Sequence, residues 1–363
     1  MFRFSRPLLL TLAALMVALG VWQATRPMVA LGVWQATRPR LPPPTVLPPE
    51  SYELALRAAR SGEPGAARLL YQQLGREDLA ATAQAALYPS LVNYPSTRAL
   101  AFVQAGLGAP DASVRLAAVE AGAQLIEGEA QAKLLGPALA DADPAVRRCA
   151  ALALMSAPPT DLGAYAEAAS QVITSYLTAL EAQQSVYSAQ LELARLQLAR
   201  ANPAQAAAAA TQALKLEPEA LPARVLLAKA TERLGSAAQA RALLAEPLRE
   251  QPDNPYLQHE LGQWLLAHQQ PEYALLALAK AVELAPQEGA FRYDLAVALY
   301  AMDQPEAAQA QLDQLIRRQP WNRKARLQLI DYYTRSGQLQ NVQVLLAELE
   351  QQNPDDPTLQ QGL

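Results

Sequence analysis

Residues able to do chemistry are scarce in this 363-residue sequence. His259 and Glu260 begin like the zinc-binding H-E-x-x-H motif, but Gln263 stands where the second histidine is needed. Cys149 is the one cysteine, which excludes an intramolecular disulfide, a zinc site of several thiolates and a c-type haem held by C-x-x-C-H. The alanines around Cys149 favour a buried, unreactive thiol. We therefore expect no catalytic residue, no metal and no cofactor.

Other common chemistries also lack their motifs. The sequence has no G-x-S-x-G nucleophile elbow, no G-x-x-x-x-G-K-S/T phosphate loop and no G-x-G-x-x-G after a strand. The formal net charge is −4, and because residues 1–40 contain five arginines and no acidic residue, the remainder carries −9. So acidic a body lacks the basic surface that nucleic acid requires. We predict a non-enzymatic protein that binds neither nucleic acid nor a small-molecule substrate.

The elements that must position any site are helical, because alanine and leucine dominate and glycine is limited to 16 residues. In the C-terminal half a proline recurs every 34 residues. If each proline is position 32 of a unit, position 7 is always leucine, and positions 8 and 20 are small in the first four units. Small residues let two antiparallel helices approach closely, and the proline ends the second helix. The prolines are Pro218, Pro252, Pro286, Pro320 and Pro354.

This skeleton resembles the tetratricopeptide repeat (TPR), a helix–turn–helix unit of the same period, over five units at about residues 187–354. The resemblance implies a right-handed solenoid of paired helices that binds protein or peptide partners. Two departures carry predictions. Pro247 stands where alanine is usual and should kink or shorten a second helix. Ile330 and Val342 replace small residues in the last unit, which we expect to be looser or to serve as the cap. No further solvating helix is evident after Pro354, so we expect an apolar end there.

The resemblance also assigns side chains to the concave wall that the first helices line. Position 9 faces this wall in the family, and positions 2, 5 and 12 add aromatic residues in the third and fourth units. The wall should have a basic end, suited to an acidic side chain or a C-terminal carboxylate, and a tyrosine-rich centre with large contact area. The predicted peptide-binding groove consists of Arg195, Lys229, Tyr256, His259, Gln263, Tyr293 and Tyr300.

A weaker repeat precedes this array. Asp111, followed by Val-Arg at 114–115, is echoed 32 residues later by Asp143 and the Val-Arg at 146–147. Each aspartate suits a helix N-cap, and each arginine can reach acidic groups in the neighbouring turn. The pattern resembles HEAT repeats. We expect HEAT-like repeats at 51–157, a linking helix at 158–186 and the TPR array at 187–363, stacked as one all-α solenoid.

The first 27 residues predict a signal or anchor. Arg3 and Arg6 precede 19 residues without charge at 7–25, which as a helix would just cross a hydrocarbon core of about 30 Å. A cleaved secretory signal with its apolar stretch at 8–17 fits the same residues. Either reading takes the body across a membrane. We expect a single-pass protein of the bacterial inner membrane with its body in the periplasm or, after cleavage, a soluble periplasmic protein.

A duplicated segment and a spacer follow at 28–50. Residues 28–39 repeat residues 16–27 letter for letter. Six prolines at 39–49 favour an extended polyproline II segment of about 30 Å. We interpret this region as a spacer that holds the folded body away from the membrane.

HEAT-like units, a linking helix and TPR units in this order resemble the C-terminal repeat region of some bacterial multihaem cytochromes c, here without the haem domain. The resemblance points to the cell envelope. We expect a membrane-tethered or exported scaffold that supports assembly of an envelope complex, respiratory or cytochrome-related. The alternative is a peptide-binding holdase or maturation factor for exported proteins such as c-type cytochromes, and an enzyme is a distant third.

Overall fold

The computed structural model describes residues 52–361. The predicted signal or anchor (1–27) and the duplicated segment with its spacer (28–50) lie outside these residues. Of the described residues, 52–357 belong to the larger of two units, and 358–361 belong to the other. Residues 52–361 form helices and contain no strand, which confirms the all-α prediction.

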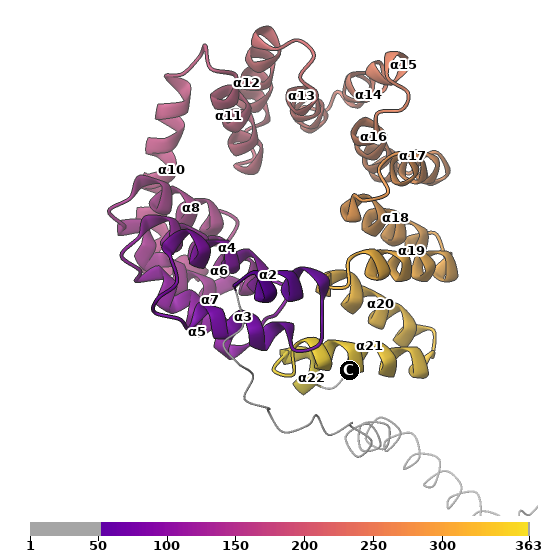
Figure 1. Cartoon of the computed structure of the whole chain (residues 1–363). Helices are drawn as coiled ribbons and strands as arrows, with labels where there is room; N and C mark the ends of the chain where they lie inside the picture. The colour runs from indigo at the N-terminus through magenta and orange to yellow at the C-terminus, as the bar shows by residue number, and fades with distance from the viewer. Residues whose placement is uncertain (1–51, 362–363) are drawn as a thin grey trace, which may run out of the picture. The chain divides into compact units, whose positions relative to one another are not determined.

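The helices before residue 182 are mostly short and rich in alanine (Figure 1). Two 3-10 helices, η1 (Gly136–Ala140) and η2 (Gly163–Tyr165), interrupt them. The region predicted to link the two arrays holds α10, the longest helix among residues 52–361. In order, the α-helices are α2 (Tyr52–Ser61), α3 (Ala66–Leu74), α4 (Ala81–Leu91), α5 (Thr97–Leu107), α6 (Ala112–Leu125), α7 (Gly128–Leu135), α8 (Pro144–Leu154), α9 (Pro159–Leu162) and α10 (Ala166–Glu181).

The 34-residue period produces helix pairs. First helices lie in one layer of the array and second helices in another (Figure 1). The first helices are α11 (Tyr187–Ala199), α13 (Leu221–Arg233), α16 (Pro255–Ala267), α18 (Gly289–Ala301) and α20 (Arg323–Arg335). The second helices are α12 (Pro203–Leu216), α14 (Ala237–Ala245) with α15 (Pro247–Glu250), α17 (Pro271–Leu284), α19 (Pro305–Arg318) and α21 (Leu339–Gln352). The short α22 (Pro357–Gln361) follows.

Small residues let the two helices of a pair approach closely. The alanines at positions 8 and 20 are buried, for example Ala296 and Ala308. In the third unit position 8 is Gly262, where a Cβ would lie only 2.7 Å from Cγ of Leu278. In the last unit Ile330 and Val342 take these two positions and are also buried.

Pro247 shortens the second helix of its unit, as the sequence predicts. Helix α14 has nine residues and ends at Ala245, and α15 adds one further turn from Pro247. The other second helices have 14 residues each. The ring of Pro247 and its missing N–H are tolerated because the proline opens a new helix at its first turn.

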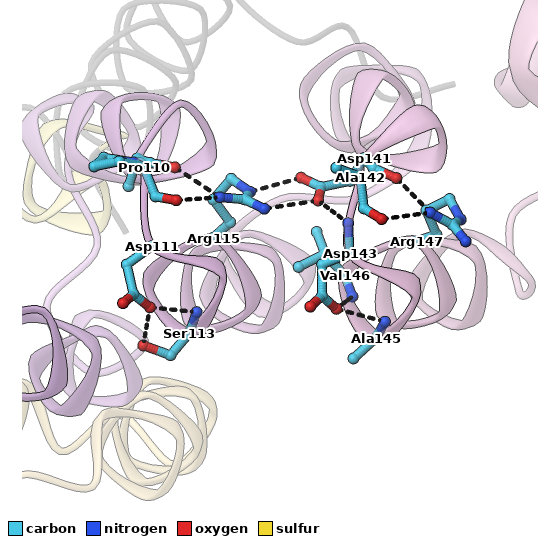
Figure 2. A network of polar contacts seen from close by, with 11 residues as sticks. Pro110, Asp111, Ser113, Arg115, Asp141, Ala142, Asp143, Ala145, Val146 and Arg147 are labelled. Carbon is cyan, nitrogen blue, oxygen red and sulfur yellow. Dashed lines mark hydrogen bonds and ion pairs between the residues drawn. The ribbon is translucent and has the colours of Figure 1, made fainter.

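An arginine–aspartate network joins the two copies of the 32-residue repeat (Figure 2). Arg115 donates two hydrogen bonds to the Asp141 carboxylate, at 2.7 and 2.9 Å, and one each to the carbonyls of Ala109 and Pro110. The side chains of Asp111 and Asp143 accept from backbone N–H groups at the starts of α6 and α8, so both are the N-caps that the sequence predicts.

The two ends of the larger unit are in contact. The N–H of Gly65, at the start of α3, donates to the carbonyl of Gln351 in α21 at 2.7 Å. The side-chain amide of Asn353, fully buried, donates to the carbonyl of Pro95 at 2.8 Å. Gly62 has φ +63°, and a Cβ there would lie 2.6 Å from the carbonyl carbon of Pro320. The last helix pair is therefore not left as an open end, contrary to the expectation, because the loops after α2 and α4 pack against it.

Buried tyrosines hold the loop after α4 in place for this contact. The hydroxyl of Tyr71 donates to the carbonyl of Tyr94 at 2.5 Å and lies 2.8 Å from Oγ of Ser96. The hydroxyl of Tyr94 donates to the carbonyl of Ala59 at 2.7 Å. Burial raises the pKa of Tyr71 to about 12, so its hydroxyl keeps its proton at physiological pH. These bonds fix the backbone that presents the Pro95 carbonyl to Asn353.

We predict that Asp141→Asn lowers the free energy of unfolding by about 2 kcal/mol, because it leaves a partly buried guanidinium without its carboxylate. Arg115 lowers the pKa of Asp141, so the stabilisation is complete above about pH 5 and is lost as the pH falls through the lowered pKa. Urea unfolding followed by circular dichroism at pH 7 and pH 3 measures both effects. Asp78→Asn, in the exposed pair with Arg76, is the control and should change the free energy of unfolding much less, because solvent screens an exposed pair. Equal losses in the two variants would contradict this prediction.

We predict that Gly62→Ala opens the contact between the ends, whereas Gly65→Ala does not. Both glycines have positive φ, so both variants strain the backbone by about 1 kcal/mol. Only at Gly62 does the added methyl group meet backbone atoms, since nothing lies within 4 Å of a Cβ at Gly65. Hydrogen exchange by mass spectrometry should be faster around residues 60–66 and 349–354 in Gly62→Ala alone. If exchange at these residues were the same in both variants, the added methyl group at residue 62 would not open the contact, and the prediction would be wrong.

Candidate functional site

All seven residues of the predicted groove lie on first helices. Arg195 is on α11 and Lys229 on α13, and α16 and α18 carry the others. We call the surface formed by α11, α13, α16, α18 and α20 the first-helix wall. Along this wall the predicted residues do not form one cluster. Apart from Tyr256, each contacts a side chain of its own unit or of the next unit.

The basic end of the wall keeps two exposed cations. Arg195 is 56% exposed and lies 3.7 Å from Glu192. Lys229 is 52% exposed, and its Nζ lies 2.9 Å from Oε2 of Glu260 on the next first helix. Tyr256, 38% exposed, has its pKa raised by burial and by Glu260, and Arg195 opposes this shift. Each of the two cations faces a carboxylate, Arg195 that of Glu192 and Lys229 that of Glu260, which partly neutralises its charge.

His259 connects two units. Its side chain is only 13% exposed, and Nε2 lies 2.8 Å from Oδ2 of Asp294 on α18. The ring stacks on Phe291 with centroids 4.4 Å apart. Gln263 reaches the same nitrogen at 3.5 Å. The surroundings of His259 are thus a carboxylate and an aromatic ring of the neighbouring unit, which suits a structural contact better than a binding role.

The tyrosines of α18 pack against α20. The hydroxyl of Tyr293 donates to Oε1 of Gln328 at 3.0 Å, and Nζ of Lys324 lies 4.2 Å from the ring centroid. Tyr300 stacks on Tyr332, with centroids 3.7 Å apart and planes 5° from parallel. Burial raises the pKa of Tyr332 to about 12. This half of the wall is an aromatic surface edged by the Lys324 ammonium group.

Sequence reasoning missed the acceptors on the following helix. Position 6 of one unit receives a side chain from position 5 or 9 of the preceding unit. A signal was available, because position 6 carries an acid or amide in four of the five units. The contacts of this type are Lys229–Glu260, His259–Asp294 and Tyr293–Gln328.

A cleft of about 470 Å³ lies where the N-terminal helices meet the first-helix wall. Val92 and Asn93 after α4, and Gln124 of α6, form one side. Tyr293 of α18 and the α20 residues Arg323, Lys324, Leu327, Gln328 and Asp331 form the other. We call it the joint cleft. It includes one residue of the predicted groove, Tyr293, and its N-terminal side was not foreseen from the sequence.

Residues 52–361 form no candidate site for metal binding or for thiol chemistry. No three side chains of His, Cys, Asp or Glu come together there as metal ligands. Burial, with Glu120 adding to it, raises the pKa of the Cys149 thiol to about 11, so the thiolate is scarce at neutral pH. None of the helices between residues 52 and 361 combines the length and apolarity needed to span a bilayer.

Comparison with known proteins gives a family for part of the chain. A family model described as tetratricopeptide repeat matches residues 197–261. Similar solved structures include YrrB, a TPR protein with an unusual peptide-binding site, at 21% identity over 51% of this chain and 94% of that chain, with a TM-score of 0.35. No curated protein matches the sequence.

Two further solved structures are similar at the same level. MamA 41-end from Desulfovibrio magneticus RS-1 is 17% identical over 48% of this chain and 98% of that chain, with a TM-score of 0.38. A thermophilic TPR protein from Thermus thermophilus, TTC0263, is 20% identical over 48% of this chain and 95% of that chain, with a TM-score of 0.37. These matches give no support to the resemblance to multihaem cytochromes, which stays a prediction.

The family model covers residues 197–261, from the end of α11 to the middle of α16, and so falls within the helix pairs whose 34-residue period and buried alanines are described above. This chain is therefore a helical-repeat protein that carries tetratricopeptide repeats.

Proposed function

We propose that the chain is a non-catalytic scaffold that binds extended, acidic polypeptide segments along its first-helix wall. The observation that carries the proposal is the exposed group at the basic end, where Arg195, Lys229 and Tyr256 project from three successive units. Tyrosine provides a large contact area and a polar tip, and exposed cations guide an acidic segment to it.

The spacing of these groups suits an extended partner. They belong to successive first helices, so a ligand must span several units to meet all of them. Helical repeats provide such long surfaces because each unit contacts only its neighbours. The partial neutralisation of Lys229 by Glu260 favours moderate affinity, since a bound carboxylate competes with one already present.

We further propose that the N-terminal segment tethers the scaffold to the bacterial inner membrane, with the repeats in the periplasm, where they collect partners into an envelope complex. The support is the sequence alone: 19 uncharged residues at 7–25 follow two arginines, and a proline-rich spacer precedes the first described helix.

We predict that Arg195→Ala weakens binding of an acidic peptide about two- to fivefold and Tyr256→Ala about five- to tenfold, from the usual cost of losing an exposed charge pair and an interface aromatic residue. Fluorescence anisotropy of the full chain in detergent, with a labelled peptide rich in serine, leucine and glutamate, measures both. The effect of Arg195→Ala should shrink as salt is added, because screening weakens exposed charges.

The matched controls lie on the second-helix layer, on α17. Lys280→Ala and Tyr273→Ala remove a partly exposed cation and an exposed tyrosine there. They should leave the affinity unchanged. Equal losses in the control and wall variants, or equal affinity for a lysine-containing counterpart of the peptide, would refute the proposed function.

A further inference from the structure

We infer that the joint cleft holds the carboxylate end of a bound polypeptide, and that this occupant and the contact between the two ends of the array stabilise each other. The inference rests on the proposed function, because it deals with the far end of the same wall. It gives the N-terminal HEAT-like helices a direct part in binding.

The chemistry of the cleft favours a peptide backbone next to a negative charge. Asn93, Gln124 and Gln328 bring three side-chain amides to it, and each amide combines donors with an acceptor, as the peptide group does. Tyr293 occupies the acceptor of Gln328, which leaves its NH2 group directed to no other side chain among residues 52–361.

One cation in the cleft is available for a carboxylate. Arg323 is paired with the buried Asp356, at 2.7 and 2.8 Å. Lys324 is exposed, lies over the Tyr293 ring and forms no ion pair with any residue from 52 to 361. The acid of the cleft, Asp331, is already paired with Arg335 at 2.9 Å. A free carboxylate therefore fits this site better than an amine.

The position of the cleft favours a chain end over a passing segment. Helix α20 is the last first helix of the wall, and the loop after α4 lies beside it, held by the bond from Asn353 to Pro95. A polypeptide that follows the wall from α11 to α20 meets Val92 and Asn93 there. A terminal carboxylate satisfies Lys324 at that point without requiring the chain to continue.

The cleft exists only while the ends are in contact, because its two sides come from opposite ends of the unit. A ligand that binds only the closed form stabilises that form by RT ln(1 + [L]/Kd), where [L] is the free ligand concentration. By the same linkage, any change that opens the contact between the ends must weaken binding of the ligand. The contact at Gly62 and the cleft share no residue, so the two can be changed separately.

The test uses the acidic peptide described above with a free C-terminal carboxylate, and the same peptide with a C-terminal amide, on the full chain. The free form should bind about three- to fivefold more tightly, from the usual value of an exposed charge pair. Lys324→Met should remove this difference and leave the amidated peptide unaffected. Asn93→Ala should weaken both forms.

Gly62→Ala should weaken the free-carboxylate peptide, and Gly65→Ala should not. The peptide should also slow hydrogen exchange at residues 60–66, which do not touch it. If both peptide forms bind equally and respond to Arg195→Ala but not to Lys324→Met, the inference is wrong and the proposed function stands. If neither form binds, both fail. If Gly62→Ala and Gly65→Ala act alike, the coupling is wrong.

Discussion

The structure depends on how closely two helices of a unit can approach. In the first four units the residues at which the pair crosses are no larger than alanine, and at Gly262 even a methyl group would lie 2.7 Å from Leu278. This constraint recurs every 34 residues and leaves little interior volume in which a site could form. The large polar and aromatic side chains of the candidate site therefore lie on the first-helix wall. The proposed function depends on which of them are exposed there.

Contacts between units determine which polar side chains of the wall are left for a partner. Pairs such as Lys229–Glu260 and Tyr293–Gln328 join one first helix to the next. These polar side chains of the wall therefore hold the array together. What remains for a partner is the exposed portion: the guanidinium of Arg195, the face of Tyr256 and the ammonium of Lys324. The two copies of the 32-residue repeat use the same principle, with Arg115 bound to Asp141 just before the second copy.

The fold could be predicted to the extent that it is local. The prolines and alanines of the 34-residue period indicated the helix pairs, Pro247 indicated the shortened α14, and Asp111 and Asp143 indicated their N-caps. The contact between the ends could not be predicted, because a repeat sequence specifies neighbours only, and Asn353 and Pro95 are 258 residues apart. The wall residues were assigned by family position. Their partners at position 6 and the N-terminal side of the joint cleft were missed, since both depend on how units stack.

Hydrogen-exchange footprinting of the full chain with an acidic peptide tests the central claim most directly, because it locates the partner without altering a residue. The account predicts slower exchange along α11, α13, α16 and α18, with α17 and α19 unchanged. Protection confined to the second helices, or none at saturating peptide, would contradict it.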